Sequence, residues 1–251
     1  ERLPERDEPF RAVLLKCQDL INRRASALIM NNEENAERWR RLYGPRIPIH
    51  LVPNGCPAEI PSFASDPYSS EAPVVLFLGS LAAPRMVRIV NEAASALKRV
   101  AAIHTVGLNK AIMYGGDSSS ALCPEVTNHG ELPESQVWDH VRCASIGLAL
   151  ATGPYPFDND VTKVFNYLRG GLPVLAEEPI LQNELVRETG FGSVFAHGDV
   201  EDLVEKAREM IRNPPRSKRH MVMSMMIREH SWDRRVDSFV DMLKALTMRH
   251  H

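Results

Sequence analysis

Short apolar segments alternate with helical patterns along most of this chain, and the alternation constrains the fold more than any other feature. Val74–Leu78 is a continuous apolar run, typical of a strand that is buried on both faces. The further strands expected after it are Ile103–Val106, Ile146–Ala149, Pro173–Ala176 and Ser193–Phe195. The helices expected between and after them cover about 85–99, 137–144, 161–169 and 200–212. This order predicts an α/β fold, a Rossmann-like parallel sheet with helices on both faces.

The first seventy residues and the last forty read differently. Before the regular alternation, the pattern predicts helices at 10–24 and 33–42 and strands at 27–30 and 47–52, with Asn31 or Asn32 capping the second helix. A turn- and proline-rich stretch, 53–72, has linker composition. Residues 214–228 are basic and then methionine-rich, and an amphipathic helix is expected over 232–247. The methionines of 221–226 favour core packing, and the basic residues before them leave association with a membrane surface as the alternative.

Composition excludes several classes of protein. The 251 residues carry 30 Lys+Arg against 32 Asp+Glu, so the chain lacks the basic excess of a nucleic-acid binder. No apolar stretch approaches the ~18–20 residues of a membrane-spanning helix, and no signal peptide is visible.

The four cysteines form no C-x2-C pair and read as reduced, mostly buried thiols of a cytoplasmic protein. The nine histidines show no metal-ligand spacing, so no metal site is predicted. The chain has no initiator Met, which indicates a start inside a longer polypeptide.

Three loops follow the carboxyl ends of the expected strands, where open parallel sheets bind their ligands: 79–85, 107–117 and 151–163. The third loop is the most informative, because it runs directly into a helix with Lys163 in the expected first turn. Backbone N–H groups at a helix start are unpaired and form the positive end of the dipole. Asp160 is the expected N-cap. A lysine is poorly placed there unless an anion binds beside it, so the loop predicts an anion site.

A family resemblance appears at this helix. Residues Asp160–Ala176 resemble the donor-site signature of retaining, family-4-like GT-B glycosyltransferases, K-x-x-E-Y-x-A-x-G-x-P-V-V-A. Four other segments fall in the family's order. They are the hinge entry Val52–Gly55, the phosphate loop Phe77–Leu81 with Arg85, the nucleobase loop His129–Leu132 and the closing segment Gly190–Gly192. The resemblance covers about residues 20–245 and implies that the chain is the C-terminal, nucleotide-sugar-binding part of such an enzyme.

The resemblance also implies roles for individual residues. Asp158 and Lys163 would be catalytic, with Asp158 orienting the donor sugar and Lys163 stabilising the leaving diphosphate in place of a bound metal. The residues implied in binding the donor are Gly79, Ser80, Arg85, His129, Leu132, Val161, Thr162, Lys163 and Asn166. Within this set, Asn166 would hold the ribose and residues 129–132 the base. The chain departs from the family where Ser80 replaces an arginine and Asn166 a glutamate. The alternatives that need no ligand are a solvated Lys163, an Asn166 on the helix surface and an Arg85 paired with a nearby carboxylate at the surface. Asp158 and Asp160 would then be loop and N-cap residues only.

The predicted activity is transfer of a sugar from a nucleotide-diphosphate donor, with no further cofactor, to an acceptor hydroxyl that stays unidentified. Residues 1–55 would be a remnant of the acceptor domain with the hinge, 56–230 the donor domain, and 231–251 a helix returning toward the acceptor domain. A partner chain or a missing N-terminal domain would complete the enzyme. The alternatives are a non-catalytic nucleotide-sugar-binding module, and an epimerase or phosphorylase of the same architecture. A dinucleotide enzyme is disfavoured because no G-x-G-x-x-G follows a strand.

Overall fold

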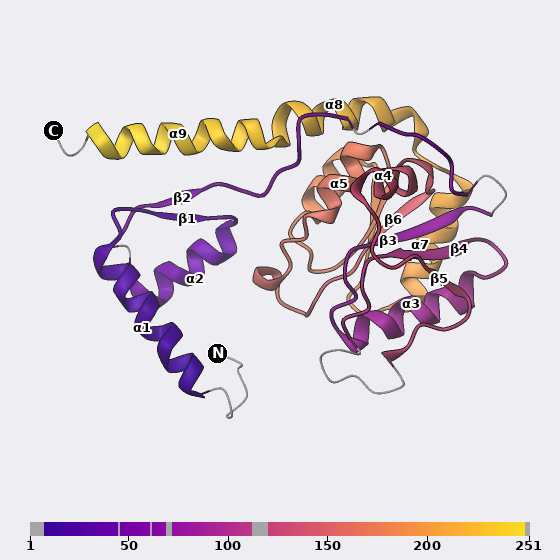
Figure 1. Cartoon of the computed structure of the whole chain (residues 1–251), viewed down its shortest axis with the longest axis horizontal. Helices are drawn as coiled ribbons and strands as arrows, with labels where there is room; N and C mark the ends of the chain where they lie inside the picture. The colour runs from indigo at the N-terminus through magenta and orange to yellow at the C-terminus, as the bar shows by residue number, and fades with distance from the viewer. Residues whose placement is uncertain (1–7, 45, 61, 69–71, 112–119, 249–251) are drawn as a thin grey trace. The chain divides into compact units, whose positions relative to one another are not determined.

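A computed structural model describes residues 8–248 apart from 45, 61, 69–71 and 112–119 (Figure 1). The end of the predicted loop 107–117 therefore lies outside the described residues. The chain divides into two compact units. Unit 1 consists of the residues up to Asn54 together with those from Arg235 onward, and unit 2 runs from Gly55 to Arg234. The roles predicted for residues 1–55, 56–230 and 231–251 stay predictions.

Unit 2 is built on a six-stranded, wholly parallel sheet in the order β5-β4-β3-β6-β7-β8. The strands are β3 Val74–Leu78, β4 Ala102–Val106, β5 Val126–Asn128, β6 Ile146–Ala149, β7 Val174–Glu177 and β8 Gly192–Phe195. Five of them match the predicted strands within two residues at each end. The sequence did not predict β5, because only Val126 of this edge strand is buried and its other two residues are exposed. The predicted α/β class with a Rossmann-like parallel sheet is confirmed.

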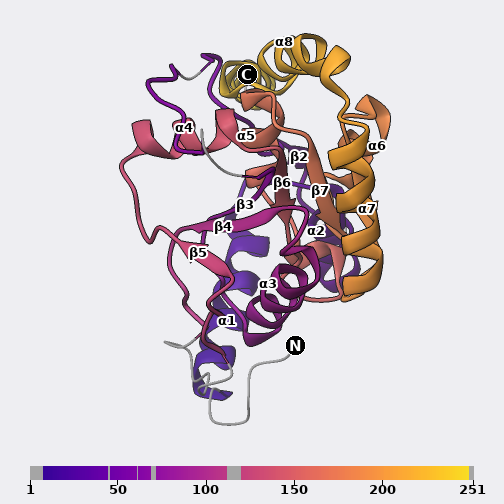
Figure 2. The same ribbon diagram turned by 90° about the vertical axis from the view of Figure 1, so that its right-hand side faces the viewer.

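Helices cover both faces of this sheet (Figure 2). On one face, α3 (Pro84–Leu97) and α7 (Val200–Arg212) pack in a core cluster with Val75 and Phe77 of β3. On the other face, α4 (Glu134–Cys143), α5 (Lys163–Gly170) and α8 (Arg219–His230) join a second cluster with Leu76. α6 (Asn183–Thr189) reaches the second cluster through Val186. Alternate residues of β3 thus enter opposite layers, as the pleat of a strand requires.

The helix α8 was missed by the sequence analysis, which assigned no element to 214–228. A 3-10 turn at Arg216–Lys218 precedes it. Its apolar residues do not gather on one face as they do in α7, so the pattern alone gave no helical signal. Val222, Met223 and Met226 are buried, while Met221 is exposed. The prediction that these methionines mainly fill the core is confirmed.

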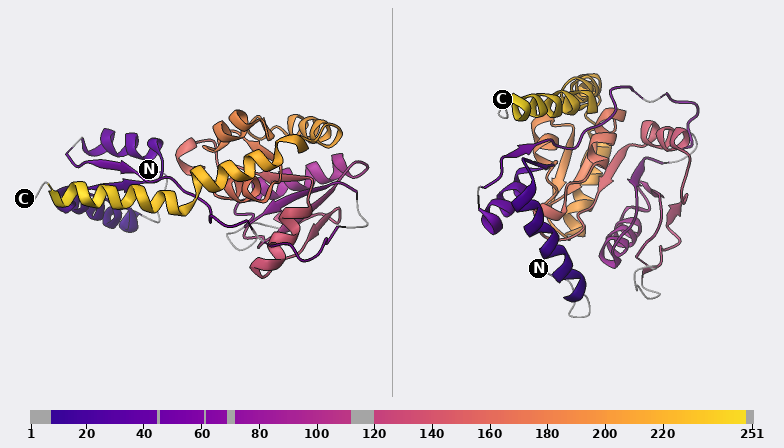
Figure 3. Two further views of the ribbon diagram at one scale, coloured as in Figure 1. Left: turned by 90° about the horizontal axis from the view of Figure 1, so that it is seen from above. Right: turned by 60° about the vertical axis from the view of Figure 1, so that its left-hand side comes forward.

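Unit 1 contains α1 (Glu8–Arg24), β1 (Leu28–Met30), α2 (Glu33–Tyr43) and β2 (Ile49–Leu51), and also α9 (Trp232–Met248) from Arg235 onward. The two strands pair in parallel as a sheet of their own, and α2 packs against both (Figure 3). The side chain of Asn32 caps α2 by accepting a hydrogen bond of 2.8 Å from the Asn35 N–H. This is one of the two caps that the sequence predicted.

The four cysteines are free thiols, but they are not mostly buried as predicted. Only Cys56 is fully buried, where its thiol donates to the Met226 carbonyl oxygen; Cys17 is exposed. Cys17 is exposed because it lies on α1, a helix whose residues are largely open to solvent. Among the described residues, none of the helices combines the length and the apolar character needed to cross a bilayer.

Candidate functional site

The strand order places a crevice at the carboxyl ends of β3 and β6. From β3 the chain winds outward to β4 and β5, and from β6 it winds the other way to β7 and β8. The loops after β3 and β6 therefore leave in opposite directions at the one place where the winding reverses. In open parallel sheets this switch point is where ligands bind. Two of the three predicted loops, 79–85 and 151–163, meet at this point.

Tyr167 separates β3 from β6 at the crevice. Its ring lies against Gly147, where an added Cβ would come within 2.6 Å of the ring. Its hydroxyl accepts a hydrogen bond of 2.7 Å from the Leu78 N–H, and the Leu76 and Leu148 carbonyl oxygens each lie 3.2 Å from it. The pairing between the two strands ends one residue earlier, at Phe77 and Leu148. The hydroxyl thus takes the place of a further ladder partner and lets the strand ends diverge.

Three glycines, Gly79, Gly107 and Gly130, allow the loops after β3, β4 and β5 to pack closely, with backbone against backbone. Gly79 has a φ of +104° and Gly107 a φ of +129°, both in the region that favours glycine. A Cβ on Gly107 would lie 2.4 Å from the Gly79 carbonyl oxygen, so the two loops cannot pack this way with side chains. Gly107 N–H in turn donates to the Gly130 carbonyl oxygen at 2.7 Å. The predicted phosphate loop is held next to the predicted nucleobase loop by these contacts.

Lys163 places a positive charge in this crevice, and no carboxylate in the described part of the chain balances it. Its ammonium lies 3.8 Å from the centroid of the Phe77 ring and 3.6 Å from the point where Gly79 would carry a Cβ. Among the described residues, no carboxylate lies within 4.0 Å of it and it makes no hydrogen bond. Burial lowers the pKa of Lys163 to about 7, because the crevice removes water from the ammonium and supplies no counter-charge. A bound anion would reverse that effect.

The helix that carries Lys163 starts later than predicted. α5 begins at Lys163, with Thr162 as an N-cap that makes no side-chain cap bond, so the prediction of Asp160 as N-cap is wrong. The reason is a contact from far along the chain. Gln182 donates 2.6 Å to the Asp160 carboxylate and accepts 2.8 Å from the Val161 N–H. The Val161 N–H, predicted to face a phosphate, is therefore already paired.

Asp158 lies exposed at the end of a 3-10 turn, Pro156–Asp158, in the loop after β6. The neighbouring Asn159 is fully buried and shapes that loop. Its side chain accepts from the Thr152 N–H at 2.6 Å and donates to the Gly153 and Tyr155 carbonyl oxygens, both at 2.7 Å. The carboxylate of Asp158 makes no hydrogen bond or ion pair among the described residues, so it is open to a ligand. Its catalytic role stays a prediction.

Arg85 is balanced inside the protein, unlike Lys163. Its guanidinium pairs with the fully buried carboxylate of Glu177 and donates 2.7 Å to the Ala151 carbonyl oxygen. Glu177 also accepts hydrogen bonds of 2.8 Å from the Ala151 and Gly198 N–H groups. The sequence left open a carboxylate partner for Arg85 at the surface, whereas the partner in the structure is a fully buried carboxylate. The ion pair of Arg85 with Glu177 thus holds together the ends of β6 and β7 and the turn after β8.

A pocket of about 510 Å³ opens between α4 and α5. It brings together three residues predicted for the nucleotide, namely Leu132, Thr162 and Asn166. The rest of its lining is Gly55, Pro57, Leu78, Glu134, Val137, Trp138, Arg169 and Trp232. The side-chain amide of Asn166 has no partner among the described residues, so it is free to bind a hydroxyl group. The volume is in the usual range for small-molecule sites.

His129 does not line that pocket and instead belongs to a cluster of rings. Its Nε2 lies 2.8 Å from Nδ1 of His104, and its ring centroid lies 4.4 Å from that of His140. Tyr68 closes the cluster with its hydroxyl 2.5 Å from Nδ1 of His140. Burial lowers the pKa of His140 to about 4, and the two neighbouring histidines add to the effect. No group of three or more His, Cys, Asp or Glu among the described residues could hold a metal ion.

Sequence reasoning missed four residues that shape the site: Asn159, Tyr167, Glu177 and Gln182. Two of them carried a signal. Glu177 is an acid directly after the apolar run Val174–Ala176, at the carboxyl end of a buried strand. Tyr167 faces Gly147, and a glycine inside a strand often marks a close approach by another group. Asn159 and Gln182 carried none, because their partners are set by the fold.

The fold is shared with several glycosyltransferases of known structure. Sucrose-phosphate synthase from Thermosynechococcus elongatus matches 95% of this chain and 62% of its own, with a TM-score of 0.73 and 14% identity. HepE from Anabaena in complex with UDP-glucose matches 92% of this chain and 67% of its own, with a TM-score of 0.74 and 15% identity. WaaG, a glycosyltransferase involved in lipopolysaccharide biosynthesis, matches 80% and 58%, with a TM-score of 0.63 and 16% identity. No protein-family model and no curated protein sequence matches the chain.

The chain has a GT-B glycosyltransferase fold. The fold implied by the resemblance at Asp160–Ala176 is thereby confirmed, over 80–95% of the chain in these three structures. The chain spans 58–67% of the length of the same three structures. At these identities the likeness is one of fold, and what the chain binds and does is argued from its own residues.

Proposed function

We propose that this chain is the donor-binding part of a metal-independent glycosyltransferase, which transfers a sugar from a nucleotide-diphosphate donor to an acceptor hydroxyl. The observation that carries the proposal is the unbalanced ammonium of Lys163 at the switch point of the sheet. A diphosphate bound there supplies the missing counter-charge. The GT-B fold and the complex of the similarly folded HepE with UDP-glucose support this choice of ligand.

In the proposed reaction, the acceptor hydroxyl oxygen forms a bond to the anomeric carbon of the sugar and releases its proton. The bond from that carbon to the diphosphate breaks, and negative charge develops on the leaving diphosphate. Lys163 stabilises this charge, because its ammonium is held in a partly dry crevice where electrostatic interactions are strong. The bare backbone at Gly79 leaves room for phosphate oxygens beside the ammonium. Arg85 is committed to Glu177, so the proposal assigns the phosphate contact to Lys163 and gives Arg85 the task of holding the loops.

The remaining donor groups fit the open side chains nearby. The ribose is assigned to the free amide of Asn166, and the base to the side of the 510 Å³ pocket lined by Leu132 and Val137. The exposed carboxylate of Asp158 is assigned to the sugar hydroxyls. His129 is assigned no contact with the base, since its ring is held by His104 and His140.

Calorimetric titration of the purified chain with UDP, GDP and ADP tests the donor site. At least one diphosphate is expected to bind more tightly than about 1 mM, which corresponds to ~4 kcal/mol. Lys163→Met should weaken that binding tenfold or more, since a charge-assisted contact is worth ~1.5–3 kcal/mol. Lys98→Met removes the same charge from an exposed position at the end of α3 and should change the affinity less than twofold. If none of the three diphosphates binds, the proposal is wrong. If Lys163→Met binds with unchanged affinity, the diphosphate site does not include Lys163.

One observation in unit 1 favours the need for a further domain or partner chain. Its helices expose many large apolar side chains: Phe10, Val13, Leu14, Leu15, Leu20 and Ile21 on α1, and Val236, Phe239, Val240 and Leu243 on α9. A parallel sheet of two strands is also small for a stable structure, because parallel sheets are normally covered on both faces. We therefore assign acceptor binding to a domain of which unit 1 is one part. Sugar transfer by the 251 residues alone to a panel of hydroxyl acceptors would contradict this need.

A further inference from the structure

A second pocket lies at the amino ends of the strands, whereas the candidate donor site lies at their carboxyl ends. It has a volume of about 410 Å³. Residues that immediately precede four strands form its floor: Pro73 before β3, Ser145 before β6, Pro173 before β7 and Phe191 before β8. Strands of four to five residues, at ~3.3 Å per residue, separate it from the crevice by roughly 13–17 Å. Nothing proposed for the donor uses this pocket.

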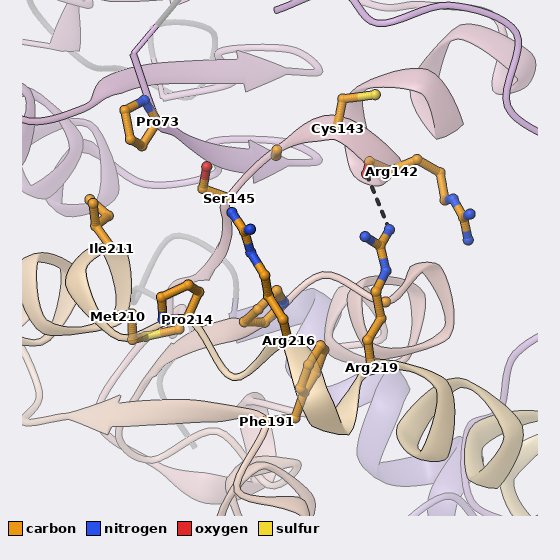
Figure 4. Close-up of a pocket in the computed structure, with 13 residues that line it drawn as sticks. Pro73, Arg142, Cys143, Ser145, Phe191, Met210, Ile211, Pro214, Arg216 and Arg219 are labelled. Carbon is orange, nitrogen blue, oxygen red and sulfur yellow. Dashed lines mark hydrogen bonds between the residues drawn. The ribbon is translucent and has the colours of Figure 1, made fainter.

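Basic side chains from the segment before and at the start of α8 enter this pocket. Figure 4 shows Arg216 and Arg219 extending from this segment toward the strand ends, with the guanidinium of Arg216 beside Ser145. Arg142 also lines the pocket, and its backbone carbonyl oxygen accepts a hydrogen bond of 3.3 Å from Arg219. Its own side chain lies beyond Arg219 in this view. Two guanidinium groups, those of Arg216 and Arg219, thus extend into the pocket, and a third arginine, Arg142, lines it.

None of these three positive charges is balanced within the described part of the chain. Among the residues that the structure describes, no carboxylate lies within 4.0 Å of Arg142, Arg216 or Arg219. Nη1 of Arg142 is buried without a hydrogen-bond partner. Burial lowers the pKa of Arg219, and the charges of Arg142 and Arg216 act in the same direction. Arg85, by contrast, pairs with the carboxylate of Glu177.

The neighbouring polar groups are also arranged to donate. The Ser145 oxygen accepts from the Val74 N–H at 3.3 Å, and its hydroxyl hydrogen has no acceptor among the described residues. Arg216 and Arg219 lie before and at the first residue of α8, where the helix dipole disfavours positive side chains. Cations and a free hydroxyl at this point together fit an anion with several acceptor oxygens.

The rest of the pocket is apolar and too large for an inorganic ion alone. Phe191, Met210, Ile211 and Pro214 form a wall beside the arginines. We propose that this pocket binds a small phosphomonoester, with its phosphate between Arg216, Arg219 and Ser145 and its organic part against that wall. A phosphate carries a charge of about −1.5 to −2 at pH 7 and three acceptor oxygens, which suits planar guanidinium groups. The site is separate from the candidate donor site, because it lies at the other ends of the strands.

Phenyl phosphate is a suitable probe, with phenol and inorganic phosphate as its two halves. Calorimetry on the full chain should give a Kd below 1 mM for phenyl phosphate and binding at least tenfold weaker for phenol. Inorganic phosphate should compete with phenyl phosphate, but with lower affinity. Arg216→Gln and Arg219→Gln should each weaken the binding of phenyl phosphate at least tenfold. Arg212→Gln removes the same charge from the end of α7, outside the pocket, and should change it less than twofold.

Two further readouts keep this proposal separate from the others. Arg216 is exposed, so Arg216→Gln is expected to fold normally even if Arg219, which packs over Gly171, is needed for stability. The affinity of Arg216→Gln for UDP should equal that of the wild type, since the donor crevice lies at the other ends of the strands. A Kd above 10 mM for phenyl phosphate, or full affinity in Arg216→Gln, would overturn the proposal. Sedimentation with phosphatidic acid vesicles in the absence of soluble binding would assign the arginines to a lipid headgroup and overturn it as well.

Discussion

Arg85 and Lys163 occupy matching places in the molecule but differ in their electrostatic surroundings. Each lies in the first turn of a helix that follows one of the two central strands, α3 after β3 and α5 after β6. The guanidinium of Arg85 faces a buried carboxylate and a carbonyl oxygen. The ammonium of Lys163 faces an aromatic ring and bare glycine backbone. The sequence predicted the same role for both, as cations for a diphosphate.

The difference comes from a residue distant in the sequence. Glu177 lies 92 positions after Arg85, and the order of strands brings it to the same edge of the sheet. No acid reaches Lys163 in the same way among the described residues. A cation beside a loop therefore marks a ligand site only where the fold delivers no acid to it. The comparison predicts that the two residues respond in opposite ways to removal.

The largest effect is expected for Arg85→Met. This change leaves the buried carboxylate of Glu177 without its counter-charge, and removing one partner of a buried pair costs about 3–5 kcal/mol. Lys163→Met removes a desolvated cation that no carboxylate among the described residues balances, so the free energy of unfolding should stay the same or rise. Urea denaturation of both variants at pH 7 measures this. Equal losses of stability in the two variants would remove the distinction between them.

A smaller effect is expected for Tyr167→Phe. The Leu78 N–H loses the hydroxyl that accepts its hydrogen bond inside the sheet, which costs about 1–3 kcal/mol. Leu78 directly follows Phe77, whose ring contacts the ammonium of Lys163. The affinity for the diphosphate should therefore also fall, by several-fold. Tyr155→Phe, a hydroxyl removal in the loop after β6, serves as the control for affinity. A Tyr167→Phe variant that is destabilised but binds diphosphates normally would limit this residue to stability.

The last prediction concerns the dependence of stability on pH, which is gradual and amounts to little over any one pH unit. Lys163 has a pKa of about 7 in the folded protein against 10.5 in the unfolded chain, so the unfolded state holds more protons between these values. The free energy of unfolding should therefore rise with pH from 7 to 10.5, by at most about 1.4 kcal/mol per unit, and the penalty is fully present below pH 7. The difference between wild type and Lys163→Met in urea denaturation at pH 7, 8 and 9 isolates this residue. Superimposable pH profiles would show that the ammonium is not desolvated.

The sequence predicted most strands of the sheet well because a strand buried on both faces consists of a continuous run of apolar residues. Val74–Leu78 and Ile146–Ala149 are apolar at every position, and the structure gives both strands the predicted bounds. The edge strand β5 and the helix α8 escaped prediction because their apolar residues follow neither a continuous run nor a single face. The predicted start of α5 was wrong because Gln182, from another loop, binds Asp160 and Val161.

The sequence by itself determined the α/β class, the parallel direction of the strands and the loops from which a site can be built, because local hydrophobic periodicity records which segments are buried. Only the tertiary structure decided which of the predicted groups are available to a ligand. Arg85 is balanced by Glu177 and His129 is held by His104, whereas Lys163 and Asn166 have no hydrogen-bond or carboxylate partner among the described residues. The reason is that the state of a charge or a hydrogen-bonding group depends on every atom within a few ångströms, and most of those atoms come from distant parts of the chain.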